Sequence, residues 1–209
     1  MTCAICEKRR PRRFCPGVRG EICPICCGTE REVSVNCPLE CEYLAEARRR
    51  ERPVPIDPAT VPNRDIEFSE ELVLRNQPLL NALGAALFGA ALESGAVDAD
   101  AREALDALAR TYRTLTGGVY YETRPAGAYA GAIYAAIQDA AERFRAAEQQ
   151  QFGLTRTRDA DVLALLVFLQ RIELDRNNGR PRGRAFIGSL QFLHAASAPP
   201  SPRSSLILP

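Results

Sequence analysis

The chain has 209 residues, of which 46% are hydrophobic and 25% are charged, and these proportions are typical of a folded globular protein. Its formal net charge of +1 gives no overall field that would attract nucleic acid or an anionic membrane. The sequence has a single histidine and no run of about 18 apolar residues, which excludes Ser-His-Asp, Cys-His and two-histidine metal chemistry and also a transmembrane helix.

The first eight residues, MTCAICEK, contain no apolar stretch of the kind found in secretory signals. We therefore expect a cytoplasmic protein whose cysteines are reduced. All eight cysteines lie between residues 3 and 41, and none follows. This partition predicts a small Cys-rich module at residues 1–52 and a separate domain after it.

Two C-x2-C turns in this module have the spacing of a zinc site. Cys3 and Cys6 form one turn, Cys23 and Cys26 form the other, and 16 residues separate the two. A tight turn directs two sulfurs at one ion, and the intervening loop lets the second turn close from the opposite side. We predict that these four cysteines bind one zinc ion.

The remaining four cysteines are enough for a second zinc ion. Cys26 and Cys27 are adjacent and their side chains diverge, so we assign them to different ions. The second site then consists of Cys15, Cys27, Cys37 and Cys41, and the two sites are interleaved. A sequential partition, with residues 3, 6, 15 and 23 in one site and residues 26, 27, 37 and 41 in the other, stays open at this point.

Other roles for the cysteines fit the sequence less well. The expected reducing compartment disfavours disulfides, and the clustering disfavours scattered, inert thiols. Iron–sulfur clusters also use thiolates, but zinc favours closed tetrahedral sets of them, and a closed set indicates structural zinc. A unit of about 45 residues has little core, so metal binding worth about 10–16 kcal/mol per site would supply its folding free energy. Without metal, the module should unfold.

Two segments of the module carry a resemblance, CPICCGTEREV at residues 23–33 and CPLECEYL at residues 37–44. They resemble the N-terminal signature of a group of uncharacterised bacterial proteins with a Cys-rich head and a helical body. The segment NGRPRGRAF at residues 178–186 resembles the group more weakly. The group implies no activity. The module is also similar in spacing to zinc-ribbon and treble-clef modules, which implies contacts with nucleic acid or protein.

A basic loop, KRRPRR at residues 8–13, is a candidate phosphate contact. Its candidate side chains are Arg9, Arg10, Arg12 and Arg13. However, residues 1–52 carry a formal charge of +3, and eight thiolates with two Zn²⁺ would bring the module to about −1. We therefore favour the interpretation that these arginines balance the anionic zinc–thiolate centres, and keep nucleic-acid binding as the alternative.

After the module, the sequence predicts a short helix, a linker and a helical bundle. Good helix formers at residues 41–50 end in a basic turn, and four prolines then predict an extended linker at residues 53–65. Residues 66–194 are predicted to form an all-α domain of about five helices, at residues 77–93, 98–116, 126–150, 159–174 and 184–193. We expect Asp98 to cap its helix, residues 162–169 to form the buried centre, and residues 195–209 to be a disordered tail.

Two loops of this domain are candidate contact surfaces. Arg180, Arg182 and Arg184 precede a predicted helix N-terminus, where they could bind an anion. The favoured interpretation is structural, with Gly179 ending a helix and the arginines of residues 176–184 pairing with carboxylates such as Glu173 and Asp175. Tyr120 and Tyr121, after a double glycine, are expected to close the end of the bundle.

From these features we predict a non-enzymatic zinc protein that works through a protein partner, with structural zinc and no membrane contact. The alternative is a nucleic-acid-associated factor that uses the arginine-rich loops. A third hypothesis is a thiol redox switch in which oxidation near Cys26 and Cys27 expels zinc. The sequence does not exclude an enzyme, because a helical domain can hold a cofactor without a short motif.

Overall fold

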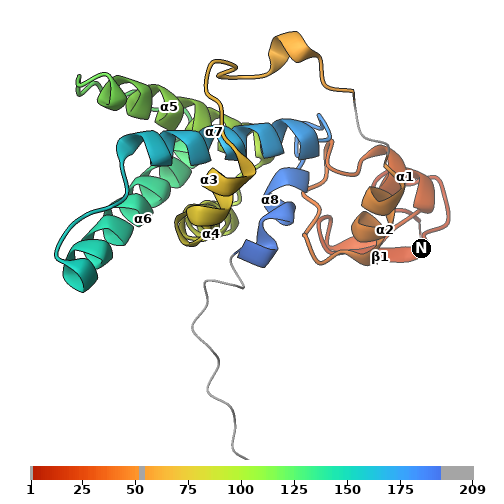
Figure 1. Cartoon of the computed structure of the whole chain (residues 1–209). Coiled ribbons are helices and arrows are strands. Elements are labelled where there is room, and N and C mark those ends of the chain that lie inside the picture. The colour runs from red at the N-terminus through yellow and green to blue at the C-terminus, as the bar shows by residue number, and fades with distance from the viewer. Residues whose placement is uncertain (1, 52–54, 194–209) are drawn as a thin grey trace, which may run out of the picture.

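The structure, a computed structural model, describes residues 2–51 and 55–193. Figure 1 shows a small N-terminal part beside a larger group of helices. We call residues 2–51 the head and residues 55–193 the body. The predicted tail at residues 195–209 and residues 53 and 54 of the predicted linker lie outside the described residues.

The head contains a hairpin and two short helices. Strands β1 (Arg13–Cys15) and β2 (Gly20–Ile22) pair antiparallel, and helix α1 (Pro24–Thr29) follows β2 directly. Helix α2 (Glu42–Arg50) confirms the helix predicted at residues 41–50. The hairpin and α1 were not predicted, because elements of three to six residues are too short to show an apolar period.

The body is built from helices of very different length. It comprises the 3-10 helix η1 (Pro58–Thr60) and the helices α3 (Glu70–Arg75), α4 (Gln77–Ser94), α5 (Asp98–Thr116), α6 (Ala128–Phe152), α7 (Asp159–Arg176) and α8 (Ala185–Ser189). Helices α4 to α7 confirm four of the predicted helices. The fifth is interrupted where a continuous helix was predicted, because α8 ends at Ser189, Leu190 forms a turn, and residues 191–193 are helical again. Helix α3 was missed, although Ser69 caps it at Leu72 N and two glutamates occupy its first turn.

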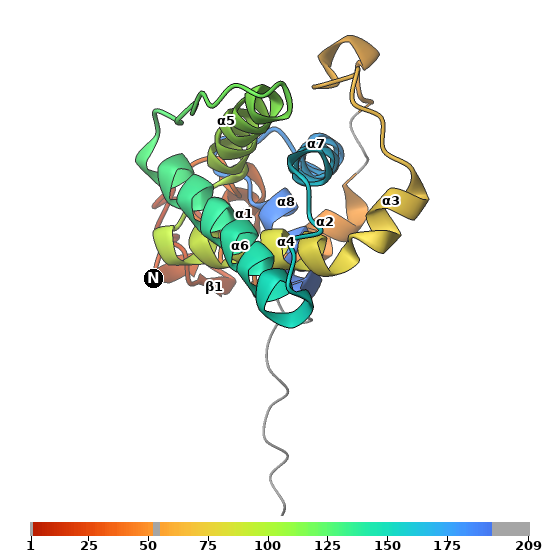
Figure 2. The same ribbon diagram turned by 60° about the vertical axis from the view of Figure 1, so that its left-hand side comes forward.

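The apolar core lies between the four long helices. α4 packs along α6, and α5 packs against both α6 and α7, an arrangement seen along the axis of α7 in Figure 2. On α7, residues 162–167 are all buried, which confirms the predicted centre apart from the partly buried Phe168. Leu83, Leu105 and Leu165 are completely buried in the same cluster. The body therefore has the contiguous core expected of a helical bundle.

The prediction for Tyr120 and Tyr121 was wrong. Their side chains are 75% and 65% exposed and do not close the bundle. The loop is held on α5 through its backbone instead, because the hydroxyl of Thr114 donates to Tyr121 O (3.0 Å) and Thr123 N donates to the hydroxyl of Thr111 (2.9 Å). Main-chain hydrogen bonds fix this loop, so the two rings are left outside.

The far end of the predicted linker is fastened to the body. The side chain of Asn63 donates to Gln170 Oε1 on α7 (2.7 Å), and Arg171 donates to Ile66 O (2.9 Å). Arg113 on α5 forms an ion pair with Asp65 (2.6 Å). Proline spacing alone could not show these contacts, because they depend on polar side chains more than 40 residues away in the sequence.

Candidate metal centre

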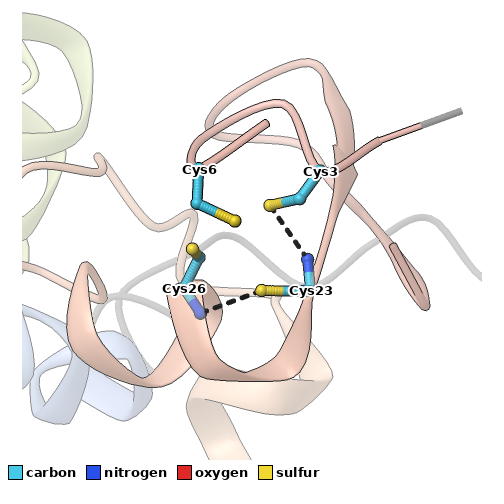
Figure 3. A group of neighbouring side chains, drawn as sticks. All are labelled: Cys3, Cys6, Cys23 and Cys26. Carbon is cyan, nitrogen blue, oxygen red and sulfur yellow. Dashed lines mark hydrogen bonds between the residues drawn. The ribbon is translucent and has the colours of Figure 1, made fainter. Parts of the chain in front are cut away.

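Four cysteine sulfurs meet in the head. The Sγ atoms of Cys3, Cys6, Cys23 and Cys26 all lie within 4.8 Å of one another. Figure 3 shows the four side chains pointing toward one another, two from a turn that precedes β1 and two from the start of α1. The structure thus brings together the four cysteines that the two C-x2-C turns predict as the first site.

Backbone hydrogen bonds place the two turns opposite each other. Ala4 N donates to Glu21 O (2.8 Å), which ties the first turn to β2, and β2 leads directly into Cys23. Glu7 N donates to Cys3 O (2.8 Å) and closes the turn, with Glu7 in the left-handed region at φ +54°. The hairpin is therefore the device that carries the start of α1 to the first pair of cysteines.

Cys3 and Cys26 share one environment, but their pKa values shift in opposite directions. Although burial opposes ionisation, backbone N–H groups, including that of Cys23 (3.2 Å), lower the pKa of Cys3 to about 6. Burial and then the sulfurs of Cys23, Cys6 and Cys3 raise the pKa of Cys26 to about 12. The raised pKa of Cys26 follows from crowding four sulfurs together, and a cation among them would relieve that repulsion.

This cluster fits a divalent metal ion. Zinc binds thiolates at about 2.3 Å, so the corners of a tetrahedral site lie about 3.8 Å apart, within the observed limit of 4.8 Å. Cys3, Cys23 and Cys26 are buried and Cys6 is half-buried, so the set is closed on most sides. Four sulfur donors and a nearly closed site are typical of a structural metal rather than a catalytic one.

The other four cysteines are arranged more loosely. Cys15, Cys37 and Cys41 gather around Val35 and Leu44. Burial, together with the negative charges of Glu32 and of the Cys15 and Cys41 sulfurs, raises the pKa of the Cys37 thiol. Over residues 2–51 and 55–193, these sulfurs do not form a second group as tight as the first.

Cys27 lies apart from that gathering. Its sulfur accepts hydrogen bonds from the guanidinium groups of Arg13 (3.6 Å) and Arg31 (3.7 Å). The second site therefore stays a prediction. The sequential partition, which would join Cys15 to Cys3, Cys6 and Cys23, is not the group that the structure brings together.

The arginines of the loop at residues 8–13 divide between the sulfurs and the surface. A hydrogen bond to Cys23 raises the pKa of the Arg9 side chain, and Arg13 contacts Cys27 while its guanidinium lies 3.9 Å from the centre of the Tyr43 ring. Arg10 and Arg12 are exposed. The guanidinium contacts of this loop to sulfur agree with the interpretation that it balances thiolate charge.

The arginines of the second loop contact the head and the end of α4. Arg180 donates to Arg31 O (3.2 Å) and forms an ion pair with Glu51 (2.9 Å), and Arg182 donates to Asn36 Oδ1 (2.9 Å). Arg184 donates to Ala96 O (3.0 Å) just beyond α4. The loop therefore joins the head to the body.

The carboxylates expected for these arginines have other partners. Glu173 pairs with Arg102 at 3.0 Å, and Asp175 pairs with Arg176 at 3.1 Å. The predicted pairing with carboxylates is thus right for Arg176 and, with Glu51 as the partner, for Arg180, whereas the side chains of Arg182 and Arg184 contact an amide and backbone carbonyls instead. Sequence proximity favoured Glu173 and Asp175, whereas the folded loop turns toward the head.

Sequence analysis missed the group at the centre of this junction, Glu32. Its side chain is fully buried, and Oε1 accepts from Arg48 (2.7 Å) and from Arg184 N (3.1 Å). Oε2 accepts from the side chain of Asn178 (2.8 Å), and Arg182 N donates to Glu32 O (2.8 Å). No local sequence pattern links these groups, because Glu32 and Asn178 are 146 positions apart in the chain.

No family description, curated protein or solved structure matches this chain. Among the helices of the described residues, none is both long and apolar enough to cross a bilayer.

Proposed function

We propose that this protein is a zinc-binding, non-enzymatic interaction protein in which zinc is structural. The observation that carries the proposal is the convergence of the Cys3, Cys6, Cys23 and Cys26 sulfurs within 4.8 Å of one another. These four residues would hold one ion, and Cys15, Cys27, Cys37 and Cys41 would hold a second after a local adjustment at Cys27. The bound ion supplies the positive charge that lets all four thiolates of a site coexist.

A structural role follows from the donor set. Four thiolates complete the coordination of a tetrahedral ion and leave no position for a water or substrate. The succession of a turn, a hairpin and a helix start around one ion is what we propose as a treble-clef-like module, in line with its spacing. Such a module presents a rigid surface, so contact with another protein is its simplest use.

Contact with a protein is favoured over contact with nucleic acid because most arginines of the two loops already bind groups of this chain. Arg9 and Arg13 contact sulfurs, and Arg180, Arg182 and Arg184 are engaged at the junction of head and body. The exposed basic side chains of the first loop, Lys8, Arg9, Arg10 and Arg12, are fewer than the six to ten phosphate contacts that give strong, salt-sensitive binding. Nucleic-acid binding that weakens steeply with salt would reverse this preference.

The test is metal analysis of the full chain purified under reducing conditions. We expect two zinc ions per chain, one after Cys23→Ser, and one after Cys27→Ser, which serves as the matched control for the second site. Replacement of zinc by Co²⁺ should give the absorption of tetrahedral thiolate coordination. Iron with sulfide would assign the site to a cluster instead, and a metal-free, ordered head would overturn the proposal.

The partner is tested with the same variants. Proteins that co-purify with the full chain should be lost from Cys23→Ser if the head forms the contact. Equal recovery from both would move the contact to the body. Peroxide-triggered zinc release at low stoichiometry, reversed by thiol, would favour the redox-switch hypothesis over a static module.

A further inference from the structure

An apolar groove lies on the body between α3, α4, α7 and α8, with a cavity volume of about 610 Å³. Inside it, the ring of Phe68 meets Phe168 edge-on, with 5.3 Å between ring centres. On its rim, Leu74 and Phe192 are 60% and 67% exposed. Single exposed apolar residues are ordinary, but an apolar hollow of this size is the kind of surface that binds a ligand or a chain segment.

The charged side chains of the groove are engaged by neighbouring groups, two of them by each other and Arg171 by backbone carbonyls and a ring. Arg171 donates to Ile66 O, and its guanidinium lies over the Phe68 ring at 4.7 Å. Arg176 and Asp175 form an ion pair with each other. The groove therefore offers chiefly apolar surface, and its occupant must be apolar rather than a free anion or cation.

We propose that the groove is a docking site for the C-terminal segment of this same chain, through Leu206, Ile207 and Leu208. Leu193, the last described residue, lines the groove, and residues 194–209 continue from that point. In that segment these three residues are the only large apolar ones, among His, Ala, Ser, Pro and Arg. These three aliphatic side chains are therefore the part of the segment that would gain most from burial in an apolar groove.

The length of residues 194–205 suits this role, because it lets residues 206–208 return to the groove while keeping them near it. A segment the length of residues 194–205 has a typical end-to-end distance of about 20 Å as a flexible chain, and about 37 Å if it is fully extended as polyproline II. Because this connection starts at the groove itself, it only has to turn back on the groove. A tether of this length gives an effective concentration in the millimolar range, so an interaction that is weak between separate molecules would still be occupied within one.

The test uses the triple variant Leu206→Ser, Ile207→Ser, Leu208→Ser and a fluorescent peptide of residues 199–209. The peptide should bind the triple variant in an anisotropy titration, and the wild-type chain should bind it at least tenfold more weakly, because its own segment competes. Adding Leu74→Glu to the triple variant should abolish peptide binding. Leu154→Glu, at a residue that is 52% exposed and lies outside the groove, is the matched control and should leave binding intact.

Three results would overturn the proposal. One is equal peptide binding by the wild type and the triple variant, and another is binding that survives Leu74→Glu. The third is a dimer in light scattering that dissociates on Leu74→Glu, since this would assign the groove to a second copy of the chain. Helicity and zinc content, measured on every variant, separate loss of docking from loss of folding, and the proposal does not depend on the metal centre.

Discussion

Apart from cysteines, the buried apolar side chains of the described head are Ile22, Val35 and Leu44, whereas α7 alone buries a continuous run at residues 162–167. Removal of apolar surface from water is the main favourable term in folding, so the body can be stabilised by its own core. The head buries too few apolar side chains to form a comparable core. Its interior is made of sulfur, and thiols become a stable interior when a metal ion holds them.

The two parts meet through polar groups rather than through a shared apolar core. Glu32 from the head, with Arg48 and the loop that contains Asn178 and Arg184, forms the buried junction. A buried carboxylate is costly unless every oxygen is paired, and here the pairing partners come from both parts. The comparison therefore predicts two separately stabilised units whose coupling runs through one carboxylate.

Metal removal should separate the two units most clearly. When the reduced protein is treated with a chelator, the head loses a contribution of about 10–16 kcal/mol per structural site, which is more than it can replace. In hydrogen exchange by mass spectrometry, amides of residues 2–51 should exchange rapidly while those of α4 to α7 stay protected. Adding zinc back should restore protection, and a head that stays protected without metal would contradict the contrast drawn here.

Glu32→Ala should weaken the link between the units. Removing one partner of a buried ion pair costs about 3–5 kcal/mol, because Arg48 and the amides of the loop lose their acceptor. The amides of residues 178–184 should exchange faster while zinc content stays at the wild-type value. The exposed Glu21, on β2, gives the matched control, Glu21→Ala, whose exchange at residues 178–184 should equal that of wild type.

A cavity in the core should affect the body alone. Leu165→Ala removes a completely buried side chain from α7 and should lower the free energy of unfolding of the body by about 2–5 kcal/mol. Urea denaturation followed by circular dichroism measures this change, and zinc content should be unaltered. Leu154→Ala, at an exposed position, should change stability by no more than about 0.5 kcal/mol. Loss of zinc from Leu165→Ala would show that the head depends on the core of the body.

The sequence predicts what is local and periodic in this molecule. Helices α4 to α6 repeat their apolar residues every three or four positions, α7 has a continuous apolar run, and the C-x2-C turns have the spacing of a metal site, so these features were predicted. The hairpin, α1 and α3 are too short for a period to show. The junction at Glu32 joins residues nearly 150 positions apart, and no local pattern encodes such a contact.

The position of Cys27 in the candidate site could likewise not be predicted from local sequence patterns. Adjacent cysteines imply that the two sulfurs diverge, and this holds, because Cys26 joins the first group while Cys27 lies against Arg13 and Arg31. Spacing does not reveal that two guanidinium groups compete with a metal for that sulfur. Their positions depend on the hairpin and on the loop after α1, neither of which the sequence indicates.

At Asp98, contacts with a distant helix replace the helix-capping role that the local sequence predicts. We expected it to cap its own helix, but Val97 occupies that position, and the Asp98 carboxylate accepts hydrogen bonds from Phe186 N (3.1 Å) and Ile187 N (3.0 Å) of α8. The carboxylate thus fastens α8 to α5 from a buried position. Burial is the main reason that the pKa of Asp98 rises to about 6, with the N–H groups of α8 opposing the shift.

This elevated pKa predicts a small pH effect that belongs to the body. Because the folded state favours the neutral acid, the contribution of Asp98 to stability is complete below about pH 4 and is lost as the pH rises through about 6. A shift of about two units corresponds to about 3 kcal/mol. Asp98→Asn cannot titrate, so the stability of wild type minus that of Asp98→Asn should fall by up to this amount between pH 4 and pH 7. Urea denaturation at each pH measures the difference.

Asp65→Asn supplies a control of opposite sign for that measurement. The ion pair with Arg113 lowers the pKa of the exposed Asp65, so its contribution to stability is present above the ordinary aspartate pKa and is lost as the pH falls. The difference between wild type and Asp65→Asn should therefore rise weakly with pH, while the difference for Asp98 falls. If both differences moved in the same direction, the assignment of the falling difference to Asp98 would be wrong, because metal release in the head is common to every variant and cancels in each difference.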